Sequence, residues 1–262
     1  MISLTSAQLD AWLAGFFWPM ARILALVATA PVLGNNGVPR RTRLGLGLAL
    51  TLAIAPLAGP FPDVSPASWQ GLLILGQQVV IGVAMGFAMR IVFTAVDMAG
   101  ELIGLQMGLG FATFFDHVHG VNSPVVAQLL GLIAMLFFLA INGHLLVIAA
   151  LAESFQVMPV GANLFGPQAA YSLVSWGGHV FTAGFTLALP VLAALVITNA
   201  ALGVLTRTAP QLNVFAVGFP ITLMLGFLML ALVLPYMTAP LEGLLTSGVQ
   251  TAMKIITPAP SP

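Results

Sequence analysis

Charged side chains are nearly absent from this chain of 262 residues. Lys and Arg number 7, Asp and Glu number 7, and together they make up 5% of the sequence, against about 25% in a soluble domain. Such a composition excludes a surface that faces water over most of its area. Because hydrophobic residues make up 60% of the chain, its surface must face lipid or other apolar protein. The net charge of zero excludes the basic footprint of a nucleic-acid-binding protein.

Cysteine is missing altogether, which excludes disulfides and thiolate metal sites. Catalytic signatures are missing too, since the chain has no His-Glu-x-x-His helix, no Gly-x-Ser-x-Gly elbow and no phosphate-binding loop. We therefore expect no enzyme and no cofactor. The first apolar stretch is too long for a cleaved signal peptide and lacks a basic leader, so no such peptide is predicted.

Six apolar segments are long enough, or nearly so, to predict membrane-spanning helices, and the expected fold class is all-α and polytopic. They cover residues 9–33, 44–57, 67–96, 125–151, 171–205 and 214–234. The second segment reaches only ~21 Å as a helix, short of the ~30 Å hydrocarbon core. Ser65 and Pro66 predict the start of the third helix, as cap and first residue. Apolar side chains at helical spacing in residues 240–257 predict an amphipathic C-terminal helix.

The arginines in short loops predict the orientation. Arg40, Arg41 and Arg43 lie between the first and second segments, and Arg207 lies between the fifth and sixth. Both loops are expected to face the cytoplasm, which places both termini outside.

Residues 97–122 are the least regular part of the chain. They are apolar but carry Gly100, Gly104, Gly108, Gly110 and Gly120. Non-helical backbone survives at membrane depth only where protein encloses it or it lines a cavity, so we expect an enclosed loop here. The spacing of four between the first three glycines lets helices approach closely, either within this chain or against another subunit.

Four charged residues, Arg22, Arg90, Asp97 and Glu101, lie in or beside apolar segments, where an unpaired charge is costly. We interpret them as structural charges that form ion pairs or reach the membrane interface. A proton or ion relay is the alternative, and it is disfavoured because charges of this kind do not recur along several helices.

A second polar group, Asp116 with His117 and His119, lies on one loop. Asn142, His144 or His179 could add a ligand. Residues this close together on a loop give poor ligand geometry, so no metal site is predicted.

Several strings along the chain are specific to one family. They are Phe17-Trp18-Pro19, Ala30-Pro31-Val32-Leu33, Val38-Pro39-Arg40-Arg41, Gly100-Glu101-Leu102-Ile103-Gly104-Leu105-Gln106-Met107-Gly108, Phe111-Ala112-Thr113-Phe114, Asn142-Gly143-His144, Asn199-Ala200-Ala201-Leu202-Gly203 and Ala209-Pro210-Gln211-Leu212-Asn213-Val214-Phe215. Over nearly its whole length the chain resembles the FliR/SctT family of bacterial type III export-gate subunits.

The resemblance implies a subunit of the flagellar type III protein export gate, a multi-pass protein of the bacterial inner membrane at the flagellar basal body. It implies a FliP-like helical part over 1–165, a FliQ-like helical hairpin over 166–240 and an amphipathic tail over 241–262. Its implied partners are FliP and FliQ, then FlhB, FlhA and the basal-body MS-ring protein, with membrane lipid and exported flagellar subunits as further contacts. Family members lie largely above the membrane plane once assembled, so the orientation predicted from hydropathy would describe an insertion state.

In the family a Gly-rich loop after the third long helix plugs the closed pore. Carried over by the matching strings, the plug comprises Gln106, Met107, Gly108, Gly110, Phe111, Phe114 and Phe115. Glycines would allow such a loop to move, and three aromatic rings could exclude water. This chain has His117 after Asp116, where the commoner pattern has proline. The loop carrying Arg207, Pro210 and Gln211 is implied as a cytoplasmic partner contact.

Two other functions stay open at this point. An injectisome subunit would share the fold and serve effector secretion, but the flagellar strings match more closely. A self-contained secondary transporter would need inverted repeats and a site at the membrane midplane, and the sequence shows no internal symmetry.

Overall fold

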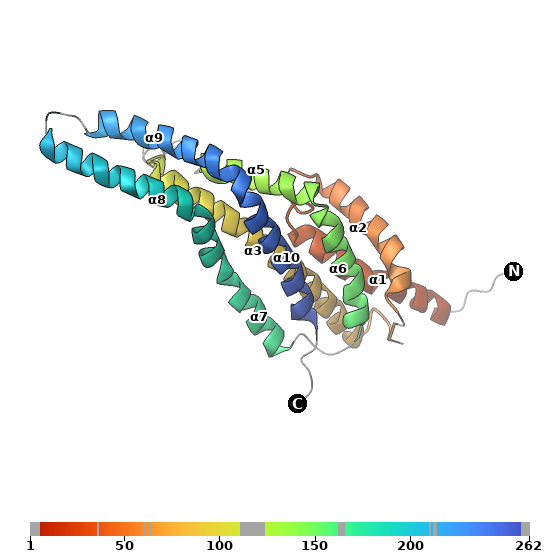
Figure 1. The fold of residues 1–262 in the computed structure, drawn as a ribbon. Helices are drawn as coiled ribbons and strands as arrows, with labels where there is room; N and C mark the ends of the chain where they lie inside the picture. Colours follow the sequence, from red (N-terminus) through yellow and green to blue (C-terminus); the bar gives the residue numbers. More distant parts are fainter. Residues whose placement is uncertain are drawn as a thin grey trace. The chain divides into compact units, whose positions relative to one another are not determined.

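The computed structural model describes residues 6–35, 37–59, 61–62, 64–110, 124–161, 166–209, 211 and 214–257. Within these ranges the chain is helical and contains no strand, which confirms the all-α fold class (Figure 1). The α-helices are α1 (Ser6–Thr29), α2 (Arg40–Ile54), α3 (Trp69–Gln106), α5 (Val125–Ala140), α6 (Gly143–Val157), α7 (Pro167–Gly177), α8 (His179–Thr208), α9 (Val214–Val233) and α10 (Thr238–Ile256). Two short 3₁₀ helices, η1 (Ala55–Leu57) and η2 (Leu234–Met237), follow α2 and α9.

The predicted number of six spans is wrong for the described part of the chain. Three stretches are long and apolar enough to cross a membrane, namely Trp69–Gln106, Pro167–Thr208 and Ala216–Ile256. A fourth is reached only if Val125–Ala140 and Gly143–Val157 form one broken span. The second predicted span falls short because α2 is only 15 residues long, or ~22 Å.

Helix α3 begins later and ends later than predicted. Ser68, not Ser65, is its cap, because the Ser68 hydroxyl accepts a hydrogen bond from the Gly71 amide at 3.0 Å. At the other end, residues 97–106 continue the helix instead of forming the expected loop. Apolar residues one helical turn apart, such as Ala99, Ile103 and Met107, are fully buried there, and this burial supports the helix through its glycines.

The fourth and fifth predicted helices are interrupted. Asn142 adopts a left-handed conformation with φ 58° and separates α5 from α6, and Gly178 separates α7 from α8. Pro190 lies inside α8, which continues through it.

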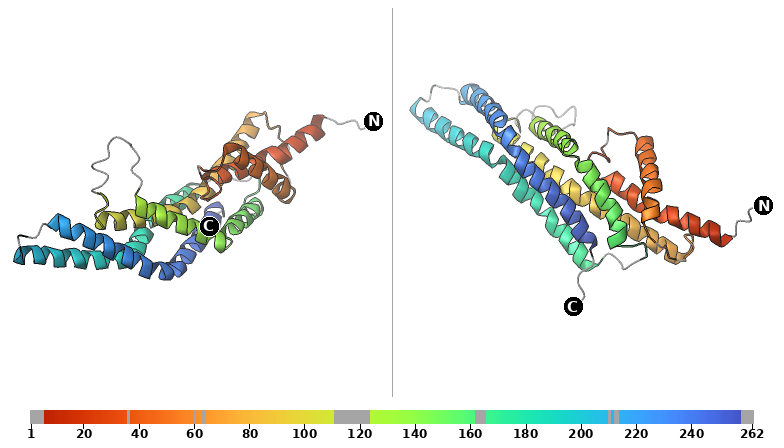
Figure 2. Two further views of the ribbon diagram at one scale, coloured as in Figure 1. Left: turned by 90° about the horizontal axis from the view of Figure 1, so that it is seen from above. Right: turned by 45° about the vertical axis from the view of Figure 1, so that its right-hand side comes forward.

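The chain divides into two compact units. Unit 1 contains Met1–Ile91, Asn142–Gly177 and Leu245–Pro262, and unit 2 contains Val92–Ile141 and Gly178–Leu244. In unit 1, α1 and α2 lie side by side (Figures 1 and 2). In unit 2, α8 and α9 form an antiparallel hairpin that both figures show clearly.

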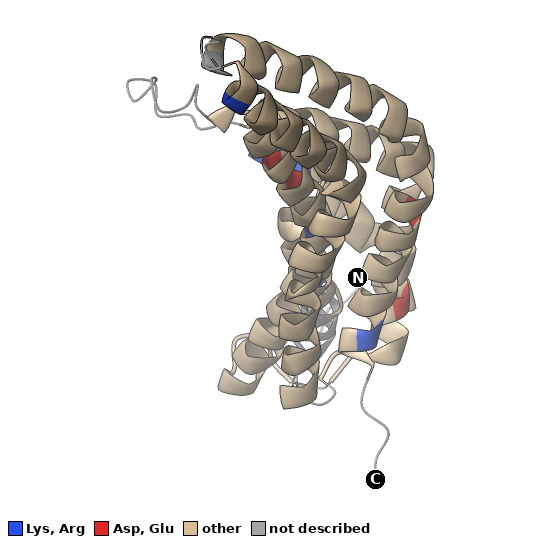
Figure 3. Ribbon diagram, turned by 60° about the vertical axis from the view of Figure 1, so that its left-hand side comes forward, with Lys and Arg blue, Asp and Glu red and all other residues tan. Residues whose placement is uncertain are grey.

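The amphipathic C-terminal helix is confirmed as α10. Leu241, Leu245 and Ile256 are buried, whereas Glu242 and Lys254 are exposed. Figure 3 shows how few charges the helices carry, since nearly every ribbon is coloured as uncharged.

Unit 2 contains a large apolar cluster. Its buried residues are Val96, Ala99, Ile103, Met107, Val126, Leu130, Ala134, Leu187, Ala188, Val191, Leu195, Leu230, Met237 and Leu241. Phe93 and Phe138 pack edge to face there, with ring centroids 5.7 Å apart. The unit is therefore held chiefly by packing of side chains from α3, α5, α8, α9 and α10.

Candidate functional site

The described part of the predicted plug is the end of α3 and the residues that follow it. Gln106 ends the helix, and Met107, Gly108 and Gly110 come directly after it. Phe111, Phe114 and Phe115 lie outside the described residues, as do Asp116, His117 and His119. We call residues 107–110, together with their contacts on α9, the gate-loop anchor.

Helix α3 ends in a Schellman motif. The Leu109 amide donates to the Gly104 carbonyl and the Gly108 amide donates to the Leu105 carbonyl, both at 3.0 Å. These two bonds define the motif, which requires a left-handed residue at the turn. Gly108 supplies it with φ 86°, a conformation that costs glycine little. Gly108 therefore sets the point at which helix α3 ends.

Helix α9 packs against the end of α3 at Met107 and Gly108. Met107 is fully buried, and its carbonyl accepts a hydrogen bond of 3.2 Å from the Thr222 hydroxyl. A Cβ placed on Gly226 would lie 2.5 Å from Met107 Cγ and 2.7 Å from Sδ, so the Met107 side chain occupies the space that this glycine leaves. A Cβ on Gly108 would lie 3.1 Å from the ring of Phe219. All of these contacts lie within unit 2.

Gly100, and the pair Gly82 and Gly86 spaced by four earlier on the same helix, serve packing within this chain. A Cβ on Gly100 would meet Ala127, with the Ala127 amide nitrogen at 2.6 Å, so α3 and α5 touch backbone to backbone. Gly82 and Gly86 lie equally close to α1, at Arg22 and Thr29. Between the two uses that the spacing allows, these contacts favour internal packing.

Arg22, in unit 1, is a buried charge that is 0% exposed. Its Nε donates to Gln78 Oε1 at 2.8 Å. Its Nη1 donates to the Ser154 carbonyl at 2.9 Å and to Ser154 Oγ at 3.1 Å, and its Nη2 donates to the Met158 carbonyl at 2.9 Å. The guanidinium carbon lies 4.2 Å from the centroid of the Phe155 ring, which adds a cation–π contact. Arg22 thereby ties α1, α3 and the end of α6 together with neutral partners.

One donor beside Arg22 has no partner in the structure. Gln78 is 0% exposed and its Nε2 is buried without a hydrogen bond. The amide group of Gln78 cannot be flipped, because the Arg22 Nε–H needs an acceptor and only Oε1 of the amide can accept. We refer to Arg22, Gln78 and Ser154 with the Met158 carbonyl as the arginine hub.

The remaining predicted residues are not brought together with these sites. Arg90, Asp97 and Glu101 lie on exposed positions of α3. Arg207 is exposed in the last turn of α8, where a cation is favourable to the helix dipole, and Gln211 is exposed beyond it. Pro210 lies outside the described residues. Among the side chains that the structure describes, no three His, Asp or Glu residues gather as metal ligands.

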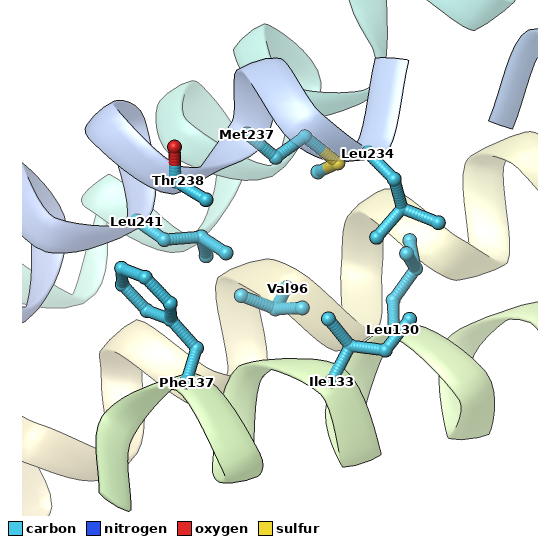
Figure 4. A pocket seen from close by; sticks show the side chains of 8 residues that line it. All are labelled: Val96, Leu130, Ile133, Phe137, Leu234, Met237, Thr238 and Leu241. Carbon is cyan, nitrogen blue, oxygen red and sulfur yellow. The ribbon is translucent and has the colours of Figure 1, made fainter. Parts of the chain in front are cut away.

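Unit 2 also contains a small apolar cavity of about 30 Å³ (Figure 4). It is lined by Val96, Leu130, Ile133, Phe137, Leu234, Met237, Thr238 and Leu241. The cavity is about large enough for one water molecule, but one hydroxyl among apolar side chains offers water too few partners. The cavity shows that the side chains beside η2 do not fill the available space.

Sequence reasoning missed Gln78, Thr222 and Gly226. The available signal was a polar side chain inside a membrane-length apolar helix, which is costly unless it has a specific partner. This pattern would have identified Gln78 and Thr222 as residues that need a partner. It does not predict which segment of the chain supplies that partner.

These features define a class, an all-helical membrane protein whose long apolar helix α3 ends in a glycine turn packed against α9. The comparisons are more specific. The family described as "Bacterial export proteins, family 1" matches residues 13–248, and the chain belongs to this family. It is 42% identical over 260 residues to the flagellar biosynthetic protein FliR of Escherichia coli (strain K12), covering 99% of both chains. It is 44% identical to the FliR protein of Pectobacterium carotovorum subsp. carotovorum over 98% of both chains, and 28% identical to that of Bacillus subtilis (strain 168) over 92% of this chain and 94% of its relative.

Proposed function

We propose that this chain is a subunit of the flagellar type III protein export gate, which helps to form and close the pore through which unfolded flagellar subunits leave the cell. The observation that carries the proposal is the likeness to FliR proteins over the full length of both chains. The apolar helices support a multi-pass protein of the inner membrane, located at the flagellar basal body. The alternatives of an injectisome subunit and a secondary transporter gain no support.

The role is conduction rather than catalysis. The gate loop that begins at Gly108 closes the pore, and Phe111, Phe114 and Phe115 exclude water from it. The motive force comes from other components of the export apparatus. FliP and FliQ are the partners within the gate, with a FliP-like part over 1–165 and a FliQ-like part over 166–240, followed by the tail over 241–262.

FlhB contacts the cytoplasmic loop with Arg207, Pro210 and Gln211, and FlhA and the MS-ring protein surround the gate. The exposed positions of Arg207 and Gln211 support this assignment. Arg22 serves as a structural charge at the arginine hub, and Arg90, Asp97 and Glu101 serve the same purpose on α3.

The test is assembly. The tagged chain is co-expressed with the FliP and FliQ proteins of the same organism, extracted in mild detergent and weighed by native mass spectrometry. A discrete hetero-oligomer with one copy of this chain supports the proposal. A stable lone monomer or homodimer, without the sister proteins, contradicts it.

The gate loop is tested in the same assembly by replacing Phe111, Phe114 and Phe115 with Gly. The assembled gate should then leak small ions, because the apolar barrier to water is gone. Normal assembly with unchanged membrane conductance would remove the plug assignment and leave the family role intact.

A further inference from the structure

Thr222 on α9 differs in its hydrogen bonding from Thr186 and Thr198 on α8. Thr186 and Thr198 each donate a hydrogen bond only to a carbonyl of their own helix, to Thr182 and Ala194. The Thr222 hydroxyl lies 3.0 Å from the carbonyl of Phe219 in its own helix and 3.2 Å from that of Met107 at the end of α3. Thr222 is also only 6% exposed. One hydroxyl proton is thus shared between α9 and the start of the gate loop.

The Met107 carbonyl needs this donor. The last carbonyls of a helix have no partner within the helix, and a Schellman motif satisfies only those further back. Here the motif uses the carbonyls of Gly104 and Leu105. Met107 is fully buried, so its carbonyl depends on a partner from another element, and Thr222 supplies it.

The three anchoring positions of α9 lie on one face of that helix. Phe219, Thr222 and Gly226 are spaced by three and four residues, which brings them into one row. The ring of Phe219 covers Gly108, the hydroxyl of Thr222 holds the Met107 carbonyl, and the gap at Gly226 receives the Met107 side chain. A movement of α9 therefore acts on Met107 and Gly108 together.

We infer that α9 positions the start of the gate loop through Thr222 and Gly226, and that this contact keeps the gate shut. The inference rests on the proposed function and adds positioning residues that lie outside the loop itself. Helix α9 starts at Val214, only ~12 Å along the helix from Thr222. The loop that carries Arg207 and Gln211 leads directly into it. A partner that binds this loop thus has a short route to the anchor along α9.

The experiment compares three variants of the complete gate, co-expressed with FliP and FliQ. Thr222→Val removes the hydroxyl and keeps the shape, Thr222→Ser keeps the hydroxyl, and Thr198→Val removes a hydroxyl that bonds only within α8. Assembly is measured by co-purification, and closure by the conductance of the gate to small ions in planar bilayers. We expect Thr222→Val to assemble normally and to leak about fivefold to tenfold more than the wild type, since one hydrogen bond shifts an equilibrium by about that factor. Thr222→Ser and Thr198→Val should stay closed.

A second pair of variants tests the side-chain contact. Gly226→Ala places a methyl group against Met107 and should also open the gate, whereas Gly203→Ala on α8 has nothing within 4 Å and should not. These two variants carry the test if Thr222→Val does not assemble.

The outcomes separate the two proposals. Equal leakage in Thr222→Val and Thr198→Val, or assembled gates of Thr222→Val or Gly226→Ala that do not leak, would overturn the anchor. Loss of assembly in both Thr222→Val and Gly226→Ala would also overturn it, because the role would then be structural. Failure of the wild-type chain to join FliP and FliQ would overturn the proposed function instead.

Discussion

The arginine hub and the gate-loop anchor join distant segments of the chain in different ways. The hub in unit 1 uses four hydrogen bonds from one buried cation, all to neutral acceptors. The anchor in unit 2 uses one shared hydroxyl proton and the fit of a methionine against a glycine. Directional bonds from a charge permit one geometry, whereas a flexible thioether against a gap tolerates movement. The hub therefore fixes the segments it joins through bond directions, whereas the anchor relies on one hydrogen bond and on side-chain fit.

The largest effect is expected from Arg22→Leu. The substitution leaves Gln78 and the Met158 carbonyl without their partner, at about 1–3 kcal/mol for each buried group. We expect a loss of about 3 kcal/mol, seen as a fall of roughly 6–12 °C in the melting temperature of the purified gate. Lys254→Leu, at an exposed position, is the control and should change little.

The double variant Arg22→Leu with Gln78→Leu sharpens this test. Replacing both partners with apolar groups should recover part of the lost stability, because no buried amide remains. If the double variant is as unstable as Arg22→Leu alone, the hub is not held by these hydrogen bonds.

A smaller effect of opposite sign is expected from Gln78→Glu. A carboxylate keeps the acceptor for Arg22 Nε, removes the Nε2 donor that has no partner, and supplies a counter-charge to the buried guanidinium. The melting temperature should rise by about 2–4 °C, which corresponds to about 1 kcal/mol. Gln156→Glu on the exposed side of α6 is the control, and an equal rise there would assign the effect to surface charge.

The smallest effect is expected from Val96→Ile, which adds one methylene beside the cavity in unit 2. Burial of a methylene contributes about 0.8 kcal/mol, and small adjustments of the neighbours offset part of it. Val191→Ile, in the core of the same unit but away from the cavity lining, should instead destabilise by overpacking. Thermal denaturation measures both variants. An equal loss of stability in both would show that the cavity beside Val96 cannot take an added methylene.

The sequence predicts the all-α fold because membrane-length apolar runs leave few alternatives. It also predicts that Arg22 has specific partners, since a lone charge in an apolar segment is costly without them. The partners themselves, Gln78 and Ser154, are 56 and 132 residues away, and no local pattern specifies such distances.

The ends of helix α3 likewise depend on contacts that the sequence does not specify. Ser65-Pro66 and Ser68 are both plausible starts for α3, and the choice depends on which serine reaches the Gly71 amide. Glycines at 100 and 104 favour a loop by propensity, yet packing against α5 keeps them helical. Tertiary packing overrides local preference at these positions, and α3 continues to Gln106 as a result.

The length of α3 also sets a requirement for the membrane around it. Its 38 residues extend ~57 Å, nearly twice the ~30 Å of a hydrocarbon core. Even a tilt of ~40°, the upper limit seen for membrane helices, leaves ~44 Å along the bilayer normal. One end of this apolar helix must therefore stand clear of the lipid. Both ends carry exposed apolar side chains, such as Trp69 and Leu105, so the end outside the lipid requires a protein sheath.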